Sequence, residues 1–116
     1  RPYNCTVLGD GPQRSLLVEQ ARNLRIDVSF RGWVNSSERN EILARADLLG
    51  FPSLVPETFG LAGVEAAALG LPAVAFYRGG AKDWLIPGVS GEAASENHLN
   101  SSELSAAIVR AMNSYD

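Results

Sequence analysis

The chain has 116 residues, 46% of them hydrophobic, and a formal net charge of -3 at pH 7. This length and composition indicate a single globular domain with a hydrophobic core, and they exclude a disordered chain. The arginines are scattered along the sequence and form no basic stripe, so a nucleic acid is not expected as a partner.

Short apolar runs alternate with helical patterns along the chain. Four runs have the composition of strands buried on both faces of a parallel sheet, namely residues 5–8, 28–30, 47–52 and 72–76. Helices are expected between and after these strands: from Pro12, over 36–46, from near Gly60, over 82–86 and over 104–112. The alternation predicts an α/β fold with a Rossmann-like, mostly parallel sheet flanked by helices.

The single cysteine and two asparagines have structural interpretations. Cys5 has no partner for an internal disulfide, and we expect it to be a small buried apolar side chain in the first strand. Asn35 and Asn100 each begin a glycosylation sequon, but Glu38 and Glu103 follow them at capping-box spacing. We therefore interpret both asparagines as helix caps.

The most apolar stretch, residues 59–76, is interrupted by Glu65 and by Gly70-Leu71-Pro72, so it is not expected to cross a membrane. No pattern of a signal peptide precedes it. We expect a soluble, cytoplasmic domain, with any contact to the inner membrane face made by regions outside this chain.

Ligands of open α/β sheets bind beyond the carboxyl ends of the strands, so each strand-to-helix turn is a candidate site. Gly9-Asp10-Gly11-Pro12 resembles a phosphate loop, but a dinucleotide fingerprint needs a third glycine where Arg14 stands, which favours a tight turn entering a helix. Gly79-Gly80 would let a ligand approach the backbone closely, and it is equally consistent with an ordinary turn.

The segment PETFGLAGVEAAALGLP, residues 56–72, is the strongest candidate. Gly60 and the small residues after it begin a helix whose free N–H groups can hold a diphosphate. Glu57, on the preceding loop, can accept hydrogen bonds from hydroxyls, and Glu65, in the second helical turn, can bind a vicinal diol. For the pair of glutamates alone, two solvated side chains are the favoured alternative.

One ordered set of residues carries a resemblance to a known family. The set is Pro52-Ser53, Glu57, Phe59-Gly60, Glu65-Ala66, Gly70-Leu71-Pro72-Ala73-Val74 and Gly79-Gly80. It resembles the C-terminal, donor-binding half of GT-B-fold retaining glycosyltransferases, family four in particular. The segments 8–12 and 30–34 fall where that family has equivalent segments, so the resemblance covers nearly the whole chain. In this setting the glutamate pair is specific to the family, and the resemblance outweighs the alternative that the two glutamates are solvated side chains at a chance spacing.

The resemblance implies a role for each matching residue. Glu57 would be the catalytic residue that contacts the hydroxyls of the transferred sugar. Glu65 would hold the ribose diol, and the backbone of Val34 would line a nucleobase site that Trp33 can cover, although packing is the commoner role of a tryptophan at a strand end. The implied donor-binding residues are Phe59, Gly60, Leu61, Glu65, Gly11, Val34, Gly79 and Gly80.

Two residues fit the family pattern less well. Asp83 stands where the family usually has a glutamate, which leaves its role open. His98 matches no motif position, and we expect it on the surface near the start of a helix.

The resemblance also implies that residues 1–116 form an incomplete donor domain. The family's donor half begins with a further strand and helix, which carry an arginine and a lysine for the diphosphate, and nothing before Cys5 supplies them. The acceptor-binding N-terminal domain is expected outside the chain as well. Because the first strand of such a sheet is central, we expect an interruption of the sheet beside Thr6–Leu8.

The function implied by the resemblance is transfer of a sugar from a nucleoside-diphosphate sugar to a glycan, lipid or small-molecule acceptor, with retention of configuration. Polysaccharide biosynthesis is the expected setting, and this chain by itself is expected to be inactive. No Asp, Cys or His pair stands at metal-ligand spacing, so no metal or cofactor is expected besides the donor substrate. A non-catalytic nucleotide-binding or interaction module and a sugar-nucleotide epimerase are the alternatives.

Overall fold

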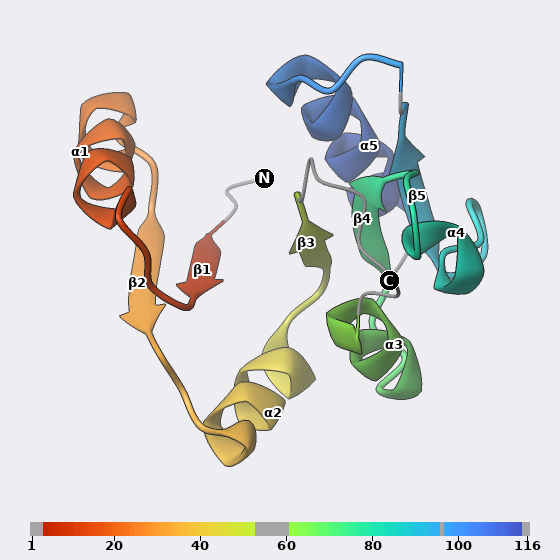
Figure 1. Ribbon diagram of the computed structural model, residues 1–116, viewed down its shortest axis with the longest axis horizontal. Coiled ribbons are helices and arrows are strands. Elements are labelled where there is room, and N and C mark those ends of the chain that lie inside the picture. The colour runs from red at the N-terminus through yellow and green to blue at the C-terminus, as the bar shows by residue number, and fades with distance from the viewer. Residues whose placement is uncertain (1–3, 53–60, 96, 115–116) are drawn as a thin grey trace. The chain divides into compact units, whose positions relative to one another are not determined.

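The computed structural model describes residues 4–52, 61–95 and 97–114 (Figure 1). Within these ranges strands and helices alternate, and every pairing between named strands is parallel. The α/β class predicted from the sequence is confirmed. The elements are β1 (Cys5–Leu8), α1 (Arg14–Leu24), β2 (Val28–Gly32), α2 (Ser36–Arg45), β3 (Leu49–Phe51), α3 (Leu61–Ala68), β4 (Ala73–Phe76), α4 (Ala81–Trp84), β5 (Gly91–Ala94) and α5 (Ser101–Ser114).

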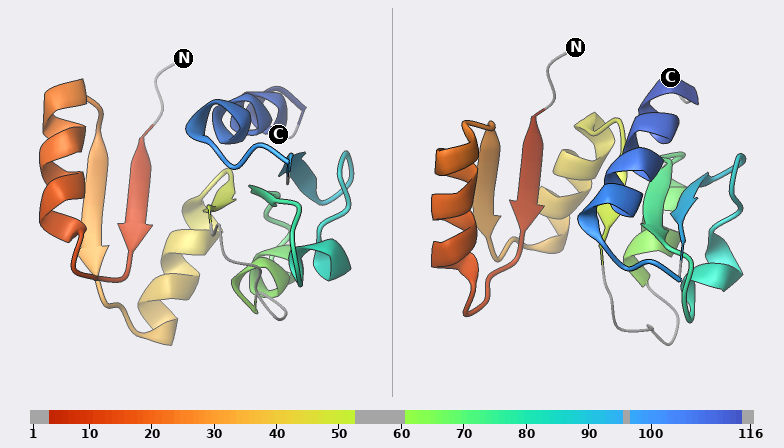
Figure 2. Two further views of the ribbon diagram at one scale, coloured as in Figure 1. Left: turned by 45° about the horizontal axis from the view of Figure 1, so that its top comes forward. Right: turned by 90° about the horizontal axis from the view of Figure 1, so that it is seen from above.

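The chain divides into two compact units, Arg1–Asn40 and Glu41–Asp116. In the first unit β1 pairs with β2, and the register shifts between Val7 and Leu8, so that Leu8 lies opposite Gly32. The connecting helix α1 lies beside β2 (Figure 2). Ala21 is its buried residue, and α1 is capped by Arg25, which has a left-handed backbone and whose N–H bonds back to Ala21 O and Arg22 O in the last turn.

The side chain of Cys5 is exposed, so the prediction that it is buried is wrong. A strand is buried on both faces only where layers cover both faces and strands flank both edges. In the described part of the first unit, β1 has β2 on one edge, and α1 is the neighbouring helix. Two strands and one helix are too few to enclose the first residue of β1.

The second unit holds the larger core. β3, β4 and β5 form a parallel sheet in that order, and all four residues of β4 are buried, as predicted for a strand covered on both faces. Small residues on α5 let this helix lie close to β4 and β5 (Figure 1). The buried cluster consists of Val74, Phe76, Ala94, Ala107 and Ala111, with Leu48, Leu99, Leu104 and Ile108 packed around it.

The strand β5 was not expected from the sequence. Its residues, GEAA, have low intrinsic preference for strands, so the local signal is weak. It forms because Gly91 to Ala94 pair in register with the buried strand β4. A Cβ on Gly91 would overlap the backbone carbonyl of Ala73, so this close pairing depends on glycine.

Among the described residues the strands form two sheets, β1-β2 in the first unit and β3-β4-β5 in the second. The interruption beside Thr6–Leu8, and the additional strand and helix that would fill it, stay predictions.

Both asparagine caps are confirmed. The Glu38 N–H donates a hydrogen bond to Asn35 Oδ1 at 2.8 Å, before α2. The Glu103 N–H donates one to Asn100 Oδ1 at 2.9 Å, before α5. Each bond satisfies one of the N–H groups that the first turn of a helix leaves without an intrahelical partner. None of the helices that the structure describes has the length and apolar character needed to span a bilayer.

A tryptophan packs α4 onto the start of α3. A Cβ on Gly63 would overlap the indole of Trp84, so α3 and α4 can approach this closely only with glycine at that position. Trp84 also meets Phe51, at the end of β3, edge to face with ring centroids 5.9 Å apart. Three elements are thus joined at the carboxyl end of β3.

We expect Gly63→Ala to lower the free energy of unfolding by about 1–3 kcal/mol, because the added methyl group must displace the indole of Trp84. The matched control is Gly50→Ala, where an added Cβ meets nothing within 4 Å. That change should leave stability unchanged or raise it by up to about 1 kcal/mol. Urea denaturation of the full-length protein measures both, and equal effects of the two changes would contradict the packing role of Gly63.

Candidate functional site

The strongest sequence candidate lies partly outside the described residues. Glu57, Phe59 and Gly60 fall there, so their positions stay predictions. The described backbone resumes with Leu61 as the first residue of α3, and half-buried Glu65 is in the second turn. This helix follows β3, so its first turn belongs to the carboxyl end of the sheet, where ligands of such folds bind.

The Gly79-Gly80 turn joins β4 to α4. Gly79 has a φ of 52°, in the left-handed region that favours glycine, and Gly80 is buried. The N–H groups of Ala81, Lys82 and Asp83 donate hydrogen bonds to carbonyls of residues 78–80, so the turn is closed by its own backbone. The predicted glycine turn therefore exists as a tight connection with an exposed first glycine.

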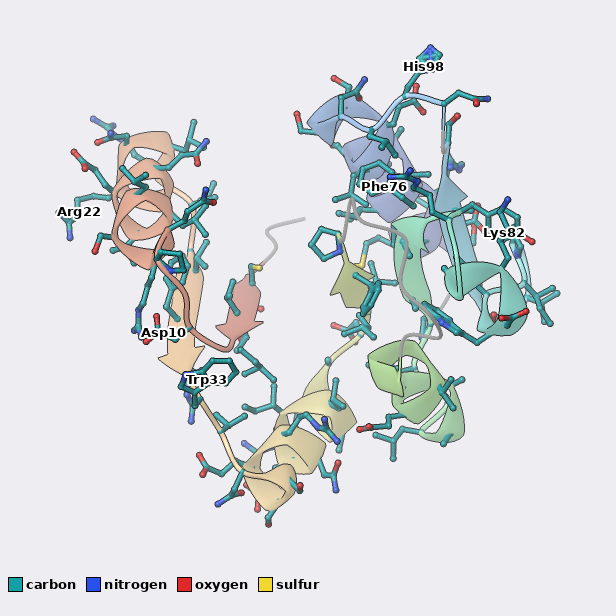
Figure 3. All side chains as sticks on the ribbon, in the orientation of Figure 1. Asp10, Arg22, Trp33, Phe76, Lys82 and His98 are labelled. Atoms are coloured by element: carbon teal, nitrogen blue, oxygen red, sulfur yellow. The ribbon has the colours of Figure 1, made fainter. Side chains whose placement is uncertain are left out.

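The two charged side chains that follow this turn, Lys82 and Asp83, face solvent. Lys82, labelled in Figure 3, is exposed. Its Nζ lies 5.6 Å from the centroid of the Tyr77 ring, within the range of a cation–π contact. Asp83 is also exposed and stands in the single turn of α4. His98 is exposed and precedes α5, as predicted.

The second unit brings four predicted residues to one edge of its sheet. β3 and β4 are parallel neighbours, so the segments that follow them leave from the same edge. Leu61 and Glu65 belong to the segment after β3, and Gly79 and Gly80 to the segment after β4. The contact between Gly63 and Trp84 keeps α3 and α4 together on this side.

The first unit has its own pair of turns at the carboxyl ends of β1 and β2. Gly9, with a φ of 103°, donates its N–H to Gly32 O at 2.8 Å, which joins the two turns. The Gly11 N–H donates to Asp10 Oδ1 at 2.7 Å. Since Asp10 already accepts this bond, the geometry agrees with the tight turn favoured from the sequence over a free phosphate loop.

Arg14, the first residue of α1, links the turn after β1 to β2 and was not recognised from the sequence. Its Nη2 donates a hydrogen bond to Phe30 O at 3.2 Å, and its Nη1 lies 3.6 Å from Asp10 Oδ2. Both side chains of the ion pair are about two-fifths exposed, at 40% and 42%. The four-residue spacing of Asp10 and Arg14 was the available signal, because it suits a salt bridge across one turn.

Trp33 and Val34 follow directly after β2. The Trp33 side chain is 80% exposed, so it is not part of the core of its unit. Its ring lies 3.7 Å from the place where a Cβ on Gly9 would stand. Val34 is half-buried beside it. Figure 3 shows Trp33 and Asp10 together at the arrowhead end of β2.

Among the described residues, no group of three or more His, Cys, Asp or Glu side chains could hold a metal ion. The described turns offer backbone N–H groups, carboxylates, guanidinium groups and an exposed indole. Such groups suit a ligand with hydroxyls, an aromatic ring and phosphates.

Comparison with known proteins places this arrangement in a family. Residues 1–116 match the family described as Glycosyl transferases group 1 over the whole chain. The chain belongs to this family. Among curated proteins it is similar to the glycogen synthase of Mycobacterium tuberculosis, with 39% identity over 88 residues. The match covers 74% of this chain and 21% of that protein, so the chain spans about a fifth of its curated relatives.

Solved structures of glycosyltransferases have the same fold over nearly the whole chain. Anabaena Alr3699/HepE in complex with UDP-glucose superposes with a TM-score of 0.70 and 28% identity, covering 96% of this chain and 36% of that one. Sucrose-phosphate synthase from Thermosynechococcus elongatus gives 0.76 and 25%, covering 93% and 29%. The group 1 glycosyl transferase chain thus corresponds to one half of a GT-B fold.

Proposed function

We propose that this chain belongs to the donor-binding half of a retaining glycosyltransferase that transfers a sugar from a nucleoside-diphosphate sugar to an acceptor. The observation that carries the proposal is the family match over all 116 residues, in a fold whose strands alternate with helices. The similarity to a structure that contains UDP-glucose supports a nucleotide sugar as the donor.

The diphosphate is assigned to the start of α3. This helix begins at Leu61, and its first N–H groups have no partner within the helix, so they can donate to phosphate oxygens. Gly60, immediately before it in the sequence, has no side chain and would leave room for a close approach. Arginine and lysine side chains outside this chain would share the negative charge.

The sugar and the ribose are assigned to the two glutamates and the glycine turn. Glu57 and Phe59 precede the start of α3, so they would contact the transferred sugar, together with Gly79 and Gly80. Glu65 lies one turn further along α3, where it would accept hydrogen bonds from the ribose diol.

The nucleobase is assigned to the turns of the first unit. Backbone groups at Gly11 and Val34 would line its edge, and the exposed ring of Trp33 offers an apolar face on which a base can stack. The acceptor would bind to regions outside this chain.

Catalysis would consist mainly of positioning and charge stabilisation. As the bond to the sugar breaks, negative charge grows on the departing diphosphate, and N–H groups aimed at that charge lower the barrier. Within this chain the helix start supplies such donors, while Glu57 would orient the sugar through its hydroxyls. No metal is required by these steps.

A donor screen of the full-length protein tests the function. Uridine, guanosine and adenosine diphosphate sugars are titrated by calorimetry and then supplied as donors in a transfer assay. We expect submillimolar binding of one nucleoside class and turnover with its sugar. Binding without turnover on any acceptor would favour a non-catalytic module, and formation of an isomeric donor would favour an epimerase.

The two glutamates should have separable effects in the full-length enzyme. Glu57→Gln should lower kcat more than it weakens nucleotide binding, because this side chain would contact the sugar being transferred. Glu65→Ala should mainly weaken nucleotide binding, by ~1.5–3 kcal/mol for each hydrogen bond lost to a charged group. Glu19→Ala, an exposed glutamate on α1, serves as the control. Equal effects of both changes on nucleotide affinity alone would contradict this division of roles.

Gly60→Val should weaken donor binding at least tenfold, because the branched side chain would block the approach of the diphosphate to the start of α3. Folding should be little affected, since the position is at a helix end. The matched control is Ala67→Val, at an exposed position of the same helix. Calorimetry with the preferred donor measures the donor affinity of both variants. If Gly60→Val binds the donor as tightly as the parent protein, the diphosphate does not bind at this turn.

A further inference from the structure

The contacts of Arg14 join a turn to a neighbouring strand. Through Asp10 its guanidinium reaches the turn after β1, and through Phe30 O it reaches the middle of β2, two residues before Gly32. A planar guanidinium has donors that point in different directions, so one side chain can hold two partners at fixed geometry. The result is a link between the β1–α1 turn and β2, the strand that leads to Trp33.

The backbone around this link is shaped to admit the guanidinium. Arg14 Nη1 lies 3.3 Å from the place where a Cβ on Gly32 would stand, so a side chain there would crowd it. Gly32 also has a φ of 68°, which disfavours any other residue. Asp10 in turn holds the Gly11 N–H, so one carboxylate fixes the turn and receives the guanidinium.

The position of the Trp33 side chain depends largely on the backbone at Gly9 and Gly32. With 80% of its side chain exposed, it has little packing of its own within the first unit. Its ring rests near Gly9, whose N–H is bonded to Gly32 O. The direction in which the ring and the Val34 backbone face therefore depends on how firmly Gly9 and Gly32 are held.

We propose that Arg14 is a positioning residue for the nucleobase end of the donor site, because it holds the Gly9–Gly11 turn and the Gly32–Val34 segment in one arrangement. The proposal rests on the function proposed above and adds a residue to it. Arg14 acts through the two turns and does not touch the reacting sugar. Loss of the link should therefore weaken nucleotide binding and leave the chemical step intact.

The variants that test this are made in the full-length protein. Arg14→Met removes both contacts and keeps the aliphatic part of the side chain. Arg14→Lys keeps the charge, but an ammonium cannot hold Asp10 and Phe30 O in the same planar arrangement. Asp10→Asn keeps an oxygen for the Gly11 N–H and loses the ion pair. Arg22→Met is the control, an exposed arginine about 12 Å further along α1.

Two sets of measurements distinguish positioning from a general loss of structure. The dissociation constants of uridine, guanosine and adenosine diphosphate are measured by calorimetry, and KM and kcat are measured with the matching sugar donor. A purely structural defect reduces the folded fraction and hence kcat, while the remaining folded molecules keep parental KM. A positioning defect raises Kd and KM and leaves kcat unchanged at saturating donor.

For Arg14→Met we expect Kd and KM to rise about tenfold with kcat within about twofold of the parent. Arg14→Lys should recover little of this loss, and Asp10→Asn should raise Kd about two- to threefold, since the pair is partly exposed. Arg22→Met should match the parent in all three quantities.

Several results would overturn the proposal. Parental Kd in Arg14→Met, full recovery by Arg14→Lys, or a lower kcat with unchanged KM would each do so. If Arg14→Met does not fold, Arg14→Lys and Asp10→Asn test the proposal in its place. A Kd equal to that of the parent in both variants then overturns the proposal. If the parent protein binds none of the three nucleoside diphosphates, the proposed function itself fails and the role of Arg14 fails with it.

Discussion

Parallel pairing of the strands is the constraint on which the rest of the structure depends. A parallel neighbour requires the chain to cross back over the sheet, and a helix makes that crossing in each described case. Every strand-to-helix turn of a unit therefore emerges at the same edge. This is why residues as distant in sequence as Leu61 and Gly80, or Gly9 and Gly32, belong to common edges. The location of the candidate site thus follows from the direction of the strands and does not depend on any particular side chain.

Glycines allow neighbouring elements of the fold to approach one another closely. Gly63 admits the indole of Trp84, Gly91 admits the carbonyl of Ala73, and Gly32 admits the guanidinium of Arg14. In each case a neighbouring group occupies the space that a Cβ would need. Of these three, Gly32 lies in the segment 30–34 that resembles the family, and in this structure it makes room for a side chain of the chain itself. A glycine in a sequence motif is by itself no evidence that a ligand approaches there.

The features that could be predicted from the sequence are those with a strong local signal. The apolar run at Ala73–Phe76 forms the buried strand, and Asn35 and Asn100 cap their helices because the bond partner is three residues away. The strand β5 and the exposure of Cys5 depend on tertiary neighbours, which no local pattern contains. Arg14 combines both cases. Its pairing with Asp10 is local, but its bond to Phe30 O crosses 16 residues and depends on how α1 returns to β2.

The two tryptophans of the chain give each unit its own spectroscopic reporter. Trp33 is in the first unit and largely exposed, whereas Trp84 is in the second, half-buried between Phe51 and Gly63. An aqueous quencher of fluorescence reaches an exposed indole sooner than a packed one. Emission from the second unit is therefore expected at shorter wavelength and with greater protection from quenching. Selective replacement of either tryptophan by phenylalanine would let the opening of one unit be followed independently of the other.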